Sequence, residues 1–134
     1  MRVFGVDSSP QRIAAARLEA RKLGSPAEFA VQEVDAANFP SGPWAGICVC
    51  HFLDRGLFNE ISRHLLPGAV LVYKTHLAHP LRSPLRRPRR SEFLLLPGEL
   101  LAALPGFVPL RYAEWMDGEG GAYAGLVARR YYSS

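Results

Sequence analysis

Two aspartates and two histidines are the residues of this sequence best placed to do chemistry. Asp7 and Asp35 end apolar, β-prone segments, and His51 and His76 each follow directly after another such segment. In a parallel sheet, the carboxyl ends of the strands form the edge at which α/β proteins bind their ligands. A carboxylate there can accept both hydroxyl groups of a ribose, and a histidine can accept a proton near neutral pH. These four residues therefore predict a binding or catalytic site.

Two of the aspartates near helix starts also have a purely structural interpretation. Asp7 precedes Ser9 and Pro10, which are typical of an N-cap and a first helical position, so Asp7 either binds a ligand or caps the turn. Asp54 and Arg55 present the same choice, because they either orient an anionic substrate or form a helix cap and a surface ion pair. The sequence leaves both alternatives open.

Cys48 and Cys50 are the only cysteines, and they alternate within an apolar run that starts at Trp44. We expect their side chains on one face of one strand, where a disulfide between such close neighbours is geometrically poor. A Cys-x-Cys pair can bind a soft metal, but two thiols without further ligands on a buried strand are typical of core packing, so we expect no metal site. The lack of disulfides, of a leader and of a long apolar stretch predicts a soluble, cytoplasmic protein without membrane contact.

Hydrophobic patterns divide the first half of the chain into alternating strands and helices. A helix starts after Ser9 and ends at Gly24, and a later one ends at the Leu66-Pro67-Gly68 stop. The run over residues 44–50 is apolar on both faces, which predicts a central strand of a covered parallel sheet. The expected strands cover residues 2–7, 28–35, 44–50 and 69–75, and the expected helices cover residues 10–23 and 57–66.

The second half of the chain begins with a proline-rich segment over residues 76–90. Its three prolines exclude a continuous helix and favour an extended, mobile loop. A short helix opens at Pro97, and two strands over residues 108–116 and 122–132 flank a glycine-rich turn, which predicts an antiparallel hairpin. Together these elements predict one α/β domain over residues 1–134, with a Rossmann-like, mostly parallel sheet and a C-terminal antiparallel hairpin.

The basic charge of the chain lies in one segment. The formal net charge is +4, from sixteen basic and twelve acidic residues, and five of the arginines fall in the 76–90 loop: Arg82, Arg86, Arg87, Arg89 and Arg90. The loop is a lid over an anionic small substrate that Arg82 contacts, a phosphate contact for nucleic acid, or a solvated loop without a partner. No aromatic residue lies between Tyr73 and Phe93 to stack on bases, which favours the lid over nucleic acid.

Several short motifs, in this order and spacing, carry a resemblance to a known family. They are Val6-Asp7-Ser8-Ser9, Asp35-Ala36, His51-Phe52-Leu53-Asp54-Arg55, the run from Leu66-Pro67-Gly68 to Tyr73, and residues 88–100 with Glu92-Phe93-Leu94-Leu95-Leu96-Pro97-Gly98-Glu99-Leu100. With acids ending the first two strands, the chain resembles the class I S-adenosylmethionine-dependent methyltransferases over nearly its whole length. It is most similar to the branch of tellurite-resistance-type enzymes.

The resemblance implies S-adenosylmethionine as cofactor and assigns roles to individual residues. Asp7, with Ser8 beside it, corresponds to the contact for the ribose hydroxyls. Asp35 corresponds to the contact for the adenine amino group, and the Ala36 backbone lies beside the ring. Cys50 and His51 correspond to positions near the methionine part of the cofactor. Few acid or base groups are needed when the leaving group departs neutral. We expect His51 and His76 to be the catalytic residues, because both fall at carboxyl ends of strands and either can accept a proton near neutral pH.

The sequence departs from the family at its start. The family's first strand and its Gly-x-Gly-x-Gly turn have no counterpart in these 134 residues. The missing strand is the central one, so the strands that begin at Val3 and Trp44 lose their shared neighbour. These two strands pair directly, or a second chain supplies the partner, or the natural protein extends upstream of Met1. We hypothesise direct closure or a homodimer through the flanking strands.

Three functions follow from the resemblance and from this departure. The leading prediction is a methyltransferase, or methyltransferase-like protein, that acts on a small molecule. The alternative is a non-catalytic remnant of the fold that serves as a dimerising or binding module. The third is an RNA-modifying methyltransferase that uses the arginine loop.

Overall fold

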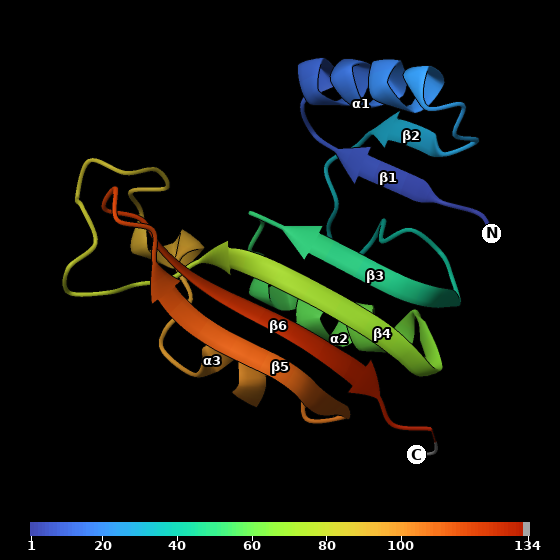
Figure 1. Ribbon diagram of the computed structural model, residues 1–134. Helices are drawn as coiled ribbons and strands as arrows, with labels where there is room; N and C mark the ends of the chain where they lie inside the picture. The colour runs from blue at the N-terminus through green and yellow to red at the C-terminus, as the bar shows by residue number, and fades with distance from the viewer. Residues whose placement is uncertain (133–134) are drawn as a thin grey trace. The chain divides into compact units, whose positions relative to one another are not determined.

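A computed structural model describes residues 1–132 of the chain, which divide into two compact units, Met1–Pro40 and the part that starts at Ser41. Each unit is described by itself below (Figure 1). No helix in the described part of the chain is long and apolar enough to cross a membrane.

The first unit is a β-α-β element with two parallel strands, β1 (Phe4–Asp7) and β2 (Glu28–Val31), joined by α1 (Pro10–Lys22). The start of the helix is the predicted one, because the Ser9 hydroxyl accepts the backbone N–H of Arg12 at 3.2 Å. Ile13 is buried, with 2% of its surface exposed, and anchors the helix. A Cβ atom at Gly5 would lie 2.8 Å from the Phe29 ring, so the strand needs a glycine there.

The second strand of this unit is shorter than the prediction over residues 28–35. It ends at Val31 because local side-chain hydrogen bonds of Asn38 turn the backbone away. The Asn38 amide donates to the carbonyl of Glu33 at 2.6 Å, and its oxygen accepts the backbone N–H of Asp35 at 2.6 Å. The prediction that Asp35 ends a strand is therefore wrong.

The second unit contains a four-stranded sheet in the order β3-β4-β6-β5. β3 and β4 are parallel, and β4-β6 and β6-β5 are antiparallel, so the predicted C-terminal hairpin is confirmed. The elements in chain order are β3 (Trp44–Cys50), the 3-10 turn η1 (Arg55–Leu57), α2 (Phe58–Arg63), β4 (Leu65–His76), the 3-10 turn η2 (Ser91–Phe93), α3 (Glu99–Ala102), β5 (Phe107–Met116) and β6 (Ala122–Arg130).

One face of this sheet carries the core of the second unit. Figure 1 shows α2 and α3 on the same side of the sheet. Alternate residues of β4 are buried, among them Leu71, Tyr73 and Thr75, and Leu100 of α3 is fully buried. The residues of β4 between these buried ones point to the other face of the sheet, which is more exposed: Val72 there is 38% exposed.

The predictions for the middle of the chain need two corrections. The helix predicted over residues 57–66 ends at Arg63, because Leu65 pairs with Trp44 and already belongs to β4. Within the sheet of the second unit, β3 pairs only with β4, so it is an edge strand of this sheet and not the predicted central one. The direct pairing of the strands from Val3 and Trp44 would join the two units and stays a prediction.

Candidate functional site

Asp7 lies at the carboxyl end of β1, as predicted, and it caps the turn before α1. Its Oδ1 atom accepts the backbone N–H of Ser9 at 2.8 Å. Its Oδ2 atom lies 3.8 Å from a guanidinium nitrogen of Arg12, and the side chain is 33% exposed. Asp7 thus makes the capping contact of the structural alternative through Oδ1, while Oδ2 makes a long ion pair, and its role as a ligand contact stays a prediction. Ser8, beside it, is exposed.

Asp35 lies in the turn that follows β2, within the same unit. Its Oδ1 atom accepts the backbone N–H groups of Ala37 at 2.9 Å and Asn38 at 3.0 Å. Ala36 is exposed at the tip of this turn. The turn therefore exposes the Asp35 carboxylate and the Ala36 backbone to solvent, with Asp35 four residues beyond the end of the strand.

His51 and His76 meet at the carboxyl ends of two adjacent parallel strands of the second unit. His51 follows β3 and His76 ends β4, and the Nδ1 atom of His51 lies 3.2 Å from the Nε2 atom of His76. His51 has a φ of 54°, which is uncommon for a residue other than glycine. Its backbone N–H donates to the carbonyl of Lys74 at 2.7 Å, which extends the strand pairing to this point. The sequence-predicted histidines are therefore brought into direct contact.

The surroundings of His76 favour its neutral form. Burial is the largest cause that lowers the pKa of His76, to about 4, and His51, Arg82, Arg86 and Lys74 lower it further by repelling the imidazolium. The side chain is therefore uncharged at neutral pH. It can share one proton with His51 across the 3.2 Å contact, with either ring as the donor.

Three residues that were not predicted as site residues complete this histidine cluster. The Tyr123 ring lies 5.4 Å from the His76 ring and 5.9 Å from the His51 ring, measured between centroids. Arg86 donates to the Tyr123 hydroxyl at 2.9 Å and to Asp117 at 3.0 Å, and the Tyr123 hydroxyl donates to Asp117 at 3.1 Å. Backbone N–H groups of the hairpin turn are the main cause that lowers the pKa of Asp117. The sequence signals for these residues were the arginine-rich loop for Arg86 and the hairpin for Asp117 and Tyr123.

The 76–90 loop lies against that hairpin turn. The backbone N–H of Ser83 donates to the carbonyl of Gly120 at 2.8 Å. Arg86 of the loop donates to Asp117 and to the Tyr123 hydroxyl. As predicted, the part of the loop beyond β4 contains no helix. Arg82 donates to the carbonyl of Pro88 at 2.8 Å, and its Nε atom is buried without a hydrogen-bond partner among the described residues. Arg90 pairs with Glu92 at 2.5 Å, so the five arginines are not one free basic patch.

Asp54 and Arg55, the other predicted substrate residues, make structural contacts. Asp54 caps η1 by accepting the backbone N–H of Gly56 at 2.9 Å. Arg55 binds both carboxylate oxygens of Glu99, at 2.6 and 2.9 Å, and also donates to the carbonyls of Glu92 and Leu94. The Arg55 guanidinium is the main cause that lowers the pKa of Glu99. These contacts favour the structural alternative for both residues.

The two cysteines share a face of β3, as predicted, with their sulfur atoms 3.7 Å apart. Both are exposed, so the prediction that they lie on a buried strand is wrong. The reason is that they share the open face of the sheet with their register partners Val72 and Lys74. No group of three or more histidine, cysteine or acidic side chains suited to a metal occurs among residues 1–132.

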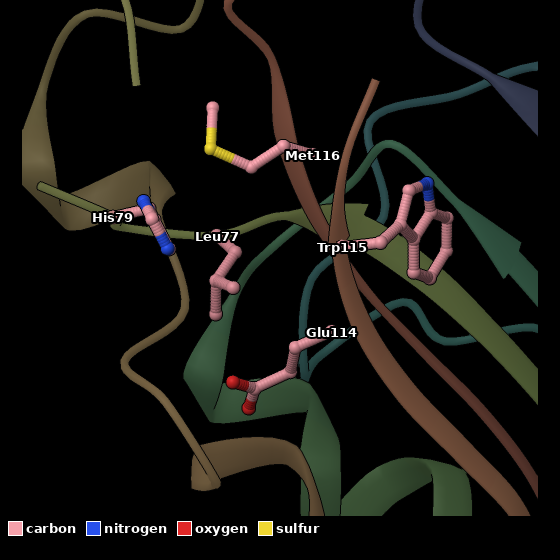
Figure 2. Close-up of a pocket in the computed structure, with 5 residues that line it drawn as sticks. All are labelled: Leu77, His79, Glu114, Trp115 and Met116. Carbon is pink, nitrogen blue, oxygen red and sulfur yellow. The ribbon is translucent and has the colours of Figure 1, made fainter. Parts of the chain in front are cut away.

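A separate pocket of about 310 Å³ lies at β5 and contains none of the predicted site residues. Leu77, His79, Glu114 and Met116 line it together with Trp115, whose indole points to the opposite side of the strand (Figure 2). The Glu114 carboxylate accepts the backbone N–H of Gly98 at 2.7 Å and a hydrogen bond from the Tyr112 hydroxyl. The one acid of this pocket is therefore already occupied by structural contacts.

No protein-family model and no curated protein sequence matches the chain. Solved structures do match it in fold. TehB from Haemophilus influenzae is 18% identical with a TM-score of 0.76, over 96% of this chain and 50% of that one. The cyclase SpnF is 18% identical with a TM-score of 0.72, over 99% of this chain and 67% of that one.

A third match is the N-methyltransferase NodS from Bradyrhizobium japonicum, which is 16% identical with a TM-score of 0.72, over 97% of this chain and 74% of that one. The chain spans half the length of TehB. At these identities the matches show the fold, which is the α/β, Rossmann-like fold of methyltransferases that the sequence predicted.

Proposed function

We propose that the protein takes part in S-adenosylmethionine-dependent methyl transfer to a small molecule. The observation that carries the proposal is the likeness of its fold to TehB and NodS over nearly all of its described residues. Because one fold hosts many chemistries, the assignment to this protein depends on its own side chains.

The side chains of the first unit fit the cofactor's polar groups in part. A ribose presents two hydroxyl donors, and the Oδ2 atom of Asp7 can accept them. Accepting them would break only the 3.8 Å ion pair of Oδ2 with Arg12. Asp35 and the exposed Ala36 backbone offer an acceptor and an amide to an adenine ring. We assign Asp7, Ser8, Asp35 and Ala36 to cofactor binding on these grounds.

The histidine cluster of the second unit fits the acceptor's need for a base. Once bound, the cofactor supplies an electrophilic methyl group and leaves as a neutral thioether. His76 is held neutral by burial and by its cationic neighbours, so it can take a proton from the acceptor directly or through His51. We propose His51 and His76 as the catalytic pair, with the backbone of Cys50 and His51 beside the reacting end.

The 76–90 loop fits the role of a cover for an anionic acceptor. The buried Nε atom of Arg82 has no partner among the described residues, which leaves a donor for an anionic group. Arg82 also lies close enough to His76 to lower its pKa. We propose Arg82 as a substrate contact; Asp54 and Arg55 support the site only through structure.

Calorimetric titration with S-adenosylmethionine tests this function. We expect micromolar binding that Asp7→Asn weakens by about tenfold or more, since about 1.4 kcal/mol of lost hydrogen bonding corresponds to a factor of ten. Glu28→Gln is the matched control, because Glu28 is an exposed acid of the same unit that pairs with Arg2. Absence of binding to the folded wild-type chain would refute the proposal.

One observation favours a second candidate, a non-catalytic dimerising or binding module. Within the described residues β3 leaves one edge unpaired, and exposed strand edges recruit further strands. Light scattering decides this candidate: we would then expect a homodimer that a β-breaking Ile47→Pro substitution converts to monomer, together with no cofactor binding.

A further inference from the structure

We propose that Cys48 and Cys50 form a two-thiolate site for a soft divalent cation of the zinc and cadmium class. The two sulfur atoms are 3.7 Å apart, and both side chains are exposed on the same face of β3. Two sulfurs that each lie about 2.3 Å from one tetrahedral metal ion are about 3.8 Å apart. The pair is therefore already spaced to bind a single ion.

The strand geometry keeps this pair available as a dithiol. Alternate residues of a strand are about 6.7 Å apart at Cα, which is the upper end of the range for disulfides, and their Cα–Cβ bonds run parallel. Intramolecular oxidation is therefore disfavoured. Cys48 and Cys50 are the only cysteines of the chain, so no third thiol competes for the pair.

Binding of a divalent cation by the pair replaces both thiol protons. The binding step breaks two S–H bonds, forms two metal–sulfur bonds and releases two protons to solvent, with no change of oxidation state.

The lysine beside Cys50 on this face does not block the site. Lys74 is the register partner of Cys50, so its side chain emerges from the same face of the sheet. Its ammonium lies over the rings of Tyr123, at 5.0 Å, and Trp115, at 5.7 Å. These rings belong to β6 and β5, on the side of β4 away from β3, so the charge is drawn away from the sulfurs.

The described residues supply only these two ligands, which defines the type of site. No group of three or more metal-binding side chains occurs among residues 1–132. The remaining positions of a tetrahedral ion are then open to water or to a small thiol. Sites with open positions exchange ligands, whereas four-cysteine sites are closed and structural.

Titration of the reduced chain with Cd²⁺ tests the proposal through the ultraviolet sulfur-to-metal charge-transfer band. We expect one ion per chain and release of two protons. Cys48→Ser and Cys50→Ser should each weaken binding by at least about tenfold, since even loss of an outer contact costs a metal site that much. Both substitutions are nearly isosteric at exposed positions, and circular dichroism checks the fold.

A spacing variant separates chelation from simple thiol content. The double substitution Val49→Cys with Cys50→Ser keeps two cysteines but places them on opposite faces of β3, so the charge-transfer band should fall to that of a single-cysteine variant. A wild-type chain that binds no Cd²⁺, or a spacing variant that binds it equally well, would overturn the proposal.

Discussion

The lowered pKa of His76 makes a specific prediction about stability in acid. Its pKa is about 4 in the folded chain against an ordinary value of 6.5. Between these two pH values the unfolded chain binds a proton that the folded chain does not, so protonation favours unfolding. The contribution of neutral His76 is fully present above about pH 6.5, falls as the pH drops, and is lost by about pH 4.

The size of this effect follows from the shift. One pKa unit corresponds to about 1.4 kcal/mol, so the full shift sets an upper limit of about 3 kcal/mol. His76 is only half-buried, and solvent screens the repulsion from Arg82, Arg86 and Lys74. We therefore expect about 1–2 kcal/mol of stability to be lost through this residue between pH 6.5 and pH 4.

Urea unfolding across this pH range measures the loss. His76→Asn should lose about 1–2 kcal/mol less than the wild type on acidification, because it has no imidazole to protonate. His79→Asn is the matched control, since His79 is an exposed histidine outside the cluster, and it should follow the wild type. Equal acid dependence of His76→Asn and wild type would refute the argument.

Proton NMR of the imidazole resonances gives an independent check. His51→Asn should raise the pKa of His76 by less than half of the shift, because burial and not His51 is the largest cause. Asparagine is chosen because it tolerates the positive φ of 54° at this position better than most residues. If the pKa of His76 returns to its ordinary value in this variant, His51 and not burial is the main cause of the shift.

Three further predictions concern the scaffold. Arg55→Gln should destabilise the chain by about 1–2 kcal/mol and raise the pKa of Glu99. The variant should then lose less additional stability than wild type when acid protonates Glu99, and urea unfolding at two pH values measures this difference. Ser9→Ala should cost about 1 kcal/mol and speed amide exchange in the first turn of α1, whereas unchanged exchange would mean that the cap contributes nothing. Gly5→Ala should cost about 1–3 kcal/mol through its clash with the Phe29 ring, and a thermal melt equal to wild type would contradict this.

The sequence by itself determined the elements whose signals are local. Ser9 and Pro10 start α1, the apolar run over residues 44–50 is β3, and the turn over residues 117–121 joins an antiparallel hairpin. Caps, short apolar runs and turns act within a few residues, so one stretch of chain carries the whole signal. Asp35 is the exception, because the side chain of Asn38 ended its strand early.

Only the tertiary structure decided what lies next to what. The contact between His51 and His76 depends on β3 and β4 being neighbours, and the Tyr123, Arg86 and Asp117 contacts join segments up to 37 residues apart. The exposure of Cys48 and Cys50 depends on what packs around β3. An apolar run has the same sequence pattern in an edge strand as in a central strand, so the pattern does not predict this exposure. Burial, charge and strand partners are properties of the neighbours, which no single segment encodes.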